Sequence, residues 1–171
     1  MKTVVLVIAP DQFRDEEYAE PKEVLERRGA TVITASVAPG PCRGRFGLLA
    51  RADEALREVS PATTDAIAFI GGAGSKVFFD DPDAHSLALA VHESGKPVAA
   101  ICIAPSTLAH AGLLGGKRVT SFPSQEDDLV AHGAAYTGAP VEIDGLIITA
   151  AGPEAATAFG EAIGDTLGLP A

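Results

Sequence analysis

The stretch Pro97-Val98-Ala99-Ala100-Ile101-Cys102-Ile103-Ala104-Pro105 decides the fold. It begins with an apolar run too short for a helix, which is typical of a strand buried in a parallel sheet. Pro105 suits the first turn of a helix, so the pattern predicts a strand, a cysteine and a helix start. A nucleophile elbow has this layout, and the partial positive charge of the helix start favours a thiolate. Taken alone, the stretch leaves two interpretations open, because Cys102 could equally be a small buried hydrophobic residue.

The rest of the chain alternates expected strands with expected helices, which indicates a mostly parallel sheet covered by helices on both faces. Strands are expected at 3–9, 31–37, 65–70, 97–102 and 118–121, at a short edge segment 48–55, and in a hairpin of 141–143 with 146–150. Helices are expected at about 15–28, 82–94, 103–114 and 153–167, with a helical turn at 125–131. Pro21 is expected to kink or divide the first helix, and the loop 38–47 is expected to expose Cys42.

Composition limits the possible functions. The 171 residues carry a formal net charge of -10, and no linker or repeat divides them, so we expect one domain over residues 1–171. Such an acidic chain repels phosphate backbones and anionic lipid, so we expect neither nucleic acid nor membrane as a partner. The two distant cysteines do not suggest a disulfide framework, and the first apolar run is too short for a signal peptide or a membrane span. We therefore expect a cytoplasmic protein.

Two segments contain candidate partners for Cys102. The turn Gly71-Gly72-Ala73-Gly74-Ser75-Lys76 follows an expected strand and could form an oxyanion hole, although it lacks Walker A spacing and could simply be a tight turn. The acidic residues Asp15, Glu16, Glu17 and Glu20 are typical of a solvated first turn of a helix. One of these carboxyls could nevertheless meet the sulfur, because both segments lie at the carboxyl ends of parallel strands. A carboxyl there would be held in its protonated form by burial and could shuttle a proton.

The four histidines, His85, His92, His110 and His132, are interpreted as surface or helix residues. None lies beside Cys102 in the sequence, and no spacing of His, Cys and Asp resembles a metal site. We therefore expect no metal and no cofactor.

Several motifs occur together in an order that resembles the DJ/ThiJ/PfpI superfamily, and its PfpI branch in particular. They are Ala99-Ala100-Ile101-Cys102 with Pro105, the Gly71-Gly72 turn, the segment Phe13 to Pro21, Val119-Thr120-Ser121-Phe122-Pro123, Asp127-Asp128 and the Asp144-Gly145 hairpin. The resemblance covers nearly the whole chain. It implies a flavodoxin-like three-layer sandwich with a nucleophile elbow, a homodimer, and chemistry without a cofactor.

The resemblance also assigns site residues. Cys102 matches the nucleophile, and Glu17 matches the buried glutamic acid that hydrogen-bonds the thiolate. Gly72 and Ile103 match the positions whose N–H groups line the oxyanion pocket, which Gly71 and Phe122 complete.

Three positions depart from relatives in this superfamily. Ile103 stands where peptidase-like members have a histidine, Lys76 stands where they have a glutamate, and Phe122 stands where the eukaryotic branch has a histidine. The resemblance therefore implies a stress-protection enzyme of the glyoxalase or deglycase kind, acting through Cys102 and Glu17 on methylglyoxal, a small aldehyde, or on glycated groups. The first alternative is a redox sensor or chaperone that uses oxidation of Cys102. The lower alternative is a cysteine peptidase or amidase, which requires a histidine from elsewhere.

Overall fold

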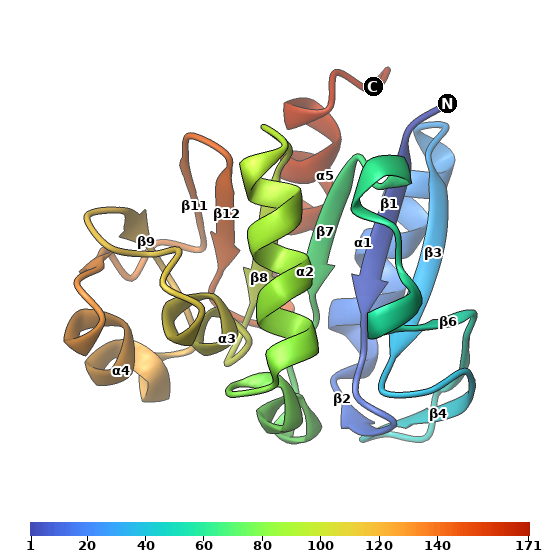
Figure 1. Cartoon of the computed structure of the whole chain (residues 1–171), viewed down its shortest axis with the longest axis horizontal. Coiled ribbons are helices and arrows are strands. Elements are labelled where there is room, and N and C mark those ends of the chain that lie inside the picture. Colours follow the sequence, from blue (N-terminus) through green and yellow to red (C-terminus); the bar gives the residue numbers. More distant parts are fainter.

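A computed structural model, which describes residues 1–171, is built around one seven-stranded sheet (Figure 1). The strand order is β11-β12-β8-β7-β1-β3-β6, and every neighbouring pair is parallel except β11 with β12. The bounds are β1 (Thr3–Val7), β3 (Thr31–Ser36), β6 (Glu54–Ala55), β7 (Ala66–Phe69), β8 (Val98–Ile101), β11 (Val141–Asp144) and β12 (Ile147–Ala150). The chain leaves β1 for β3 on one side and returns to β7 on the other. This reversal is the point at which open α/β sheets place their sites.

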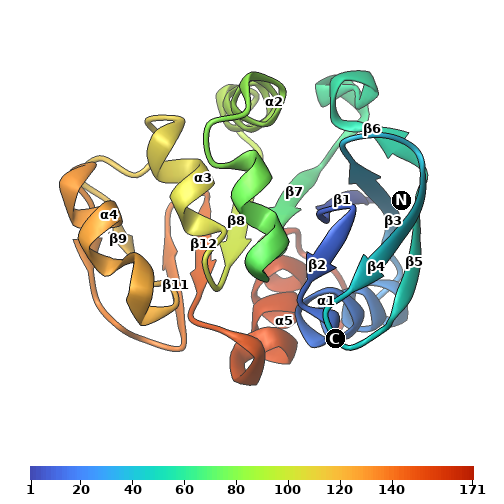
Figure 2. The same cartoon turned by 90° about the horizontal axis from the view of Figure 1, so that it is seen from below.

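Helices cover both faces of the sheet, as the view from below shows (Figure 2). Helices α1 (Asp15–Arg27) and α5 (Ala156–Thr166) pack together on one face, and α2 (Pro82–Glu93) and α3 (Pro105–His110) lie on the other. Two hydrophobic clusters of similar size, with 24 and 21 buried residues, fill the two interfaces between helices and sheet. The predicted three-layer α/β sandwich is therefore confirmed.

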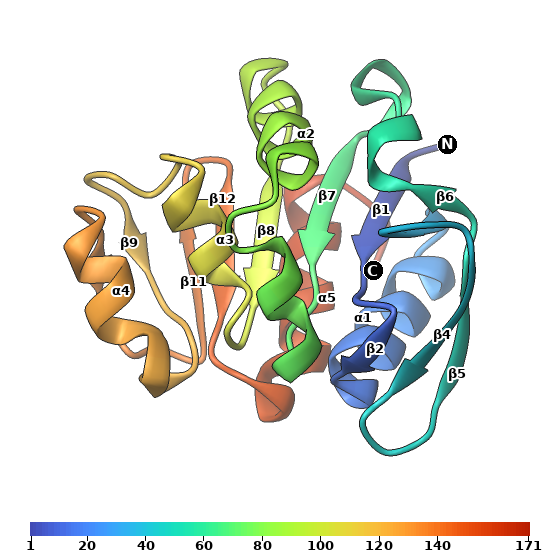
Figure 3. The same ribbon diagram turned by 60° about the horizontal axis from the view of Figure 1, so that its bottom comes forward.

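Smaller elements gather at the carboxyl ends of the parallel strands and beside them (Figure 3). They are the three-stranded sheet β2 (Asp11–Phe13), β4 (Gly40–Gly44) and β5 (Leu49–Ala52), the pair β9 (Arg118–Val119) and β10 (Ala135–Tyr136), and helix α4 (Glu126–Ala131). Five 3-10 helices complete the chain at Leu56–Glu58, Pro61–Thr63, Ala73–Phe78, Pro123–Gln125 and Pro153–Ala155.

In the first half of the chain, the expectation of an exposed Cys42 was wrong, and one of the two alternatives for the first helix is excluded. Cys42 is only 3% exposed, because the expected loop 38–47 instead contributes β4, which pairs with β2 and β5 and turns Cys42 into the core. Pro21 does not divide the first helix, since α1 runs through it as one element. The proline ring is buried against α5, where Gly160 packs so closely that an added Cβ would lie 2.8 Å from the Pro21 Cα.

The helix after Cys102 is shorter than expected, because it ends at His110 rather than near residue 114. Gly112 has φ +82°, and the N–H of Leu113 donates to the carbonyl of Leu108 at 3.0 Å, which is the bonding pattern of a Schellman cap. The Asp144-Gly145 hairpin is confirmed, since β11 and β12 pair antiparallel around Gly145, whose φ is +60°. No helix in the structure has the length and apolar character needed to cross a membrane.

Candidate active site

Cys102 occupies a sharp turn directly after β8, with a backbone φ of +65° that non-glycine residues rarely adopt. Two main-chain hydrogen bonds hold the turn. The N–H of Cys102 donates to the Ala150 carbonyl at 2.9 Å, and the Phe122 N–H donates to the Cys102 carbonyl at 2.8 Å. This strained backbone, at the start of α3 and at the carboxyl edge of the sheet, has the geometry of a nucleophile elbow.

The glycine pair leaves space for the groups around the sulfur. A Cβ added to Gly71 would collide with the Glu17 carboxyl and lie 2.5 Å from the Cβ of Cys102. Gly72 has φ +98° and lies against the main chain of residues 12–14, so a side chain there would meet backbone. Position 71 therefore lies between Cys102 and Glu17, and both glycines are required by close approach.

Glu17, in the first turn of α1, is completely buried beside Cys102. Neither carboxyl oxygen has a hydrogen bond of standard geometry, although the Cys102 thiol and the Gly71 N–H are close enough to favour the charged form. Burial outweighs both of these groups and raises the pKa of Glu17 from 4.5 to about 7. This carboxyl therefore gains and loses its proton near neutral pH.

The thiol is not activated in the way that the sequence suggested. Burial, together with the charge of Glu17, raises the pKa of Cys102 from 9.0 to about 12, against the opposing effect of the Gly72 and Ile103 N–H groups. The expectation that the helix start alone favours a thiolate was therefore wrong, because burial and Glu17 outweigh it. A proton on Glu17 removes that charge, so the two groups titrate as a coupled pair.

A cavity of about 490 Å³ opens over Cys102. Gly72, Ile103 and Phe122 line it as expected, and Phe122 is 45% exposed at its mouth. The remaining lining residues are Arg14, Arg45, Ala73, Lys76, Ser124, Gln125, Pro153 and Glu154. Three basic side chains therefore gather around one cavity of a chain whose net charge is -10.

No histidine lines this cavity. The structure brings together Cys102, Glu17, Gly71, Gly72, Ile103 and Phe122, all of which the sequence indicated. Within one chain, the sulfur has a carboxyl and two N–H groups as its polar partners.

Comparison with known proteins identifies the family. The sequence profile described as the DJ-1/PfpI family matches residues 2–166. The chain belongs to the DJ-1/PfpI family. A relative named a deglycase in Pyrococcus abyssi is 36% identical over 82% of this chain and 85% of its own length.

Solved structures of family members agree with this assignment. A ThiJ/PfpI domain protein from Brachyspira murdochii superposes with a TM-score of 0.95 at 29% identity, over 97% of this chain and 96% of that one. DJ-1beta of Drosophila melanogaster superposes with a TM-score of 0.89 at 27% identity, over 98% of this chain and 91% of that one. The DJ-1/PfpI fold therefore extends over nearly all of the chain.

Sequence reasoning missed the basic lining of the cavity. Arg14 precedes α1, Arg45 follows β4, and Lys76 lies in the 3-10 helix Ala73–Phe78, so three separate segments contribute one charge each. Arg14 and Arg45 also lie over the ring of Phe46, at 5.0 and 5.5 Å from its centroid. Only the position of Arg14, three residues before Glu17, was a signal in the sequence.

Proposed function

We propose that this protein is a cofactor-independent enzyme that converts α-oxoaldehydes such as methylglyoxal, or the adducts they form on thiols and amines, into hydroxy acids. Cys102 is its nucleophile and Glu17 its acid–base group. The observation that carries the proposal is the fully buried Glu17 carboxyl beside the strained Cys102, with a pKa raised to about 7. A group that titrates near neutral pH serves equally well as base and as acid.

The first step is addition of the thiol to the aldehyde. The sulfur of Cys102 bonds to the aldehyde carbon C1, the carbonyl π bond breaks, and the thiol proton passes through Glu17 to the new oxygen. The N–H groups of Gly72 and Ile103, which lie near the sulfur, would stabilise that oxygen while it carries charge. The product is a hemithioacetal.

Glu17 then moves a proton between two carbons. Its carboxylate removes the hydrogen from C1, and the electron pair forms an enediol with the neighbouring ketone carbon C2. The same proton returns to C2, the hydroxyl proton on the C1 oxygen passes to the C2 oxygen, and C1 becomes the carbonyl of a lactoyl thioester on Cys102. Water attacks C1 and the C–S bond breaks, which releases lactic acid and restores the thiol. Overall, methylglyoxal and one water give lactic acid, so C1 is oxidised and C2 is reduced with no external electron acceptor.

The cavity indicates which substrates suit the site. Arg14, Arg45 and Lys76 line the cavity that contains the thiol. Their positive charge would attract a substrate or product that carries a carboxylate or phosphate into this cavity. Members of the family from Pyrococcus are named deglycases. Removal of a methylglyoxal adduct from a thiol or amine would use the same addition and proton transfer.

Lactate release from methylglyoxal tests the proposal. Purified protein should form lactate, Cys102→Ser should not, and Cys42→Ser should retain the rate, because Cys42 is buried in β4 away from the cavity. Equal lactate formation by wild type and Cys102→Ser would overturn it.

A second candidate is a redox sensor, which the same geometry favours in one respect. Two molecules of peroxide would convert the thiol to a sulfinic acid with release of two waters. A protonated Glu17 and the two N–H groups could then donate to the new oxygens. Intact mass after mild peroxide should show two added oxygens in wild type and none in Cys102→Ser. Oxidation that is spread over other residues would contradict this role.

An amidase or peptidase would need a histidine base, and no histidine lines the cavity at Cys102. We propose a homodimer on the strength of the family resemblance, and a second copy is the natural source of such a histidine. Light scattering tests the dimer, and a fluorogenic peptide that is not cleaved would exclude the peptidase.

A further inference from the structure

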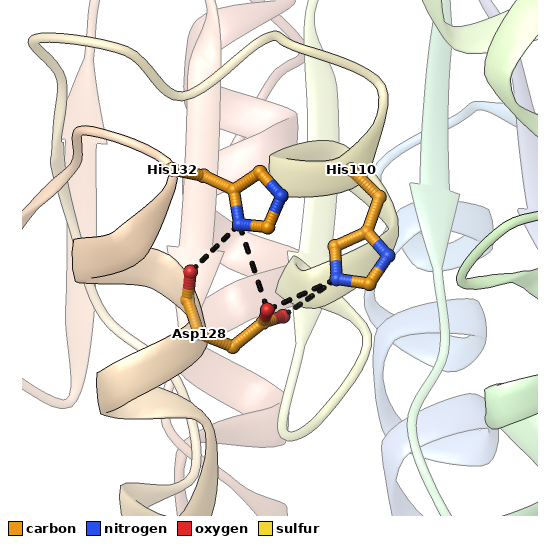
Figure 4. A group of neighbouring side chains, drawn as sticks. All are labelled: His110, Asp128 and His132. Atoms are coloured by element: carbon orange, nitrogen blue, oxygen red, sulfur yellow. Dashed lines mark hydrogen bonds and ion pairs between the residues drawn. The ribbon is translucent and has the colours of Figure 1, made fainter.

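His110, Asp128 and His132 form a cluster at the carboxyl end of α3, here called the histidine cluster (Figure 4). His110 is the last residue of α3, Asp128 lies in the first turn of α4, and His132 caps the end of α4. One possible ligand atom from each residue lies within 4.8 Å of the others. The sequence spacing alone did not indicate this group, because the fold brings its three residues together from two separate segments.

We propose that the histidine cluster binds one divalent transition-metal ion of the Zn²⁺ type. Two imidazoles and one carboxylate form a typical three-residue ligand set for such an ion, with water in the remaining position. The His110 Nε2 lies 2.9 Å from Asp128 Oδ2, and the His132 Nδ1 lies 3.5 Å from Asp128 Oδ1. Ligand atoms around a tetrahedral ion with bonds of about 2.0 Å are separated by about 3.3 Å, so these atoms are already close to the required spacing.

One side chain has to move to complete the site. The rings of His110 and His132 are stacked at 4.7 Å between centroids, and the His132 Nδ1 also lies 2.8 Å from the Asp128 main-chain carbonyl oxygen. His132 has 38% of its side chain exposed, so its ring is free to rotate toward the ion. His110 and Asp128 are less exposed, at 20% and 31%, and form the fixed part of the site.

Asp80 provides an independent reason to assign a metal site. Its Oδ1 lies 2.7 Å from the Nδ1 of His110, on the side of the ring opposite Asp128. A metal-binding histidine is usually supported by a carboxylate that accepts a hydrogen bond from its non-coordinating ring nitrogen. This bond keeps the proton on that nitrogen, so the lone pair of the second ring nitrogen can bind the metal. The only charged partners of Asp80 and Asp128 are His110 and His132. A cation that replaces the hydrogen bond between His110 Nε2 and Asp128 would therefore meet no competing lysine or arginine.

The proposed ion would join two parts of the fold. His110 ends α3, the helix that begins at Pro105 shortly after Cys102, whereas Asp128 lies in α4 and His132 caps it (Figure 4). An ion bound to all three residues would tie α4 to α3 only in the folded chain, and would therefore raise the melting temperature. The inference is independent of the reaction proposed at Cys102.

Zinc titration of a Cys102→Ser protein tests the proposal, because this background removes the one thiol that faces the active-site cavity. After removal of metals with a chelator, calorimetry should show one Zn²⁺ per chain, together with a rise in melting temperature. His110→Asn and His132→Asn should each weaken binding at least tenfold. His92→Asn, a partly exposed histidine on α2, is the matched control and should leave binding unchanged.

Two further measurements separate ligation from folding. Asp80→Asn should weaken zinc binding about tenfold, although His110 should still coordinate the ion, because Asp80 only positions the His110 ring. Co²⁺ in place of Zn²⁺ should shift the NMR signals of two histidine rings in the parent and of one in His132→Asn. Because His132 is exposed, His132→Asn and the parent should have the same melting temperature when neither contains metal. Zinc affinity that is unchanged in both His110→Asn and His132→Asn would overturn the proposal.

Discussion

The two ends of the segment from Cys102 to His110 carry chemistry of opposite kinds. At Cys102 the reactive groups are buried, and main-chain geometry creates the site through a φ of +65° and the glycine pair. At the histidine cluster the groups are partly exposed, and side chains at the ends of two short helices form the arrangement. Chemistry that needs burial is therefore built into the fold, whereas the surface cluster could be removed by two or three substitutions without changing the fold.

The variant with the largest expected effect tests whether the buried Glu17 carboxyl takes part in the reaction or only supports the structure around Cys102. Glu17→Gln should lower lactate formation by about 100-fold or more, because proton transfer by a positioned group contributes that much. The same change should speed alkylation of Cys102 by iodoacetamide at neutral pH, because the charge of Glu17 raises the pKa of the thiol. Both rates are measured on the same preparation.

Glu16→Gln is the matched control, since Glu16 is partly exposed and ion-paired with Arg14 at 2.8 Å. A parallel loss of alkylation and turnover in Glu17→Gln would indicate that Glu17 only holds the elbow in place.

The second test concerns the cost of burying Glu17. In the folded chain its carboxyl keeps a proton up to about pH 7, whereas the ordinary pKa is 4.5. Between these values the folded state binds more protons than the unfolded state, so its stability falls as pH rises. Relative to Glu17→Gln, the parent should lose about 3 kcal/mol of unfolding free energy between pH 5 and pH 8.

Urea denaturation at both pH values measures this difference, in a Cys102→Ser background so that the thiol does not titrate. A difference between parent and Glu17→Gln that stays constant with pH would show that Glu17 is ionised throughout the range.

The third test compares the glycines of the two regions. Gly71→Ala should destabilise the protein by about 2 kcal/mol and suppress turnover, because the new methyl group collides with Glu17 and Cys102. Gly115→Ala, near the histidine cluster, has open space around the added Cβ and should be neutral. Thermal melts and lactate assays of both variants provide the comparison, and equal effects would show that the Cys102 site is less tightly packed than the structure indicates.

The smallest effect concerns the basic lining of the cavity. Lys76→Ala should raise KM about threefold for the hemithioacetal of methylglyoxal with N-acetylcysteine, which carries a carboxylate, because an exposed charge contributes less than about 1 kcal/mol. The adduct with N-acetylcysteine amide has no charge and is the matched substrate, for which KM should not change. An equal rise for both adducts would assign Lys76 a packing role.

The sequence was informative where the fold depends on local pattern. The apolar run before Cys102, the glycine pair after β7 and the Asp144-Gly145 turn each have a backbone requirement that few residues meet, so their arrangement was predictable. A carboxyl near Cys102 was predictable because the acidic segment and Cys102 follow strands of one parallel sheet, and the resemblance to the superfamily singled out Glu17. The burial that raises the pKa of both groups depends on packing from several elements, so the protonation of the pair was not predictable.

The histidine cluster shows the limit of such reasoning. Asp128 and His132 are four residues apart, a spacing that places two side chains on one face of a helix, and this signal was available in the sequence. His110 reaches them only because Gly112 ends α3 early and α4 packs beside it, and no local pattern specifies that contact.

The φ of Cys102 also has an evolutionary consequence. A left-handed backbone is easy for glycine and costly for most other residues, and the hydrogen bonds that hold this turn involve only the main chain of Cys102. A glycine codon differs from a cysteine codon by one nucleotide. If the thiol had no use, random mutation would readily replace it with a residue that relieves the strain and keeps the fold. A cysteine at this position therefore suggests that selection still acts on its sulfur.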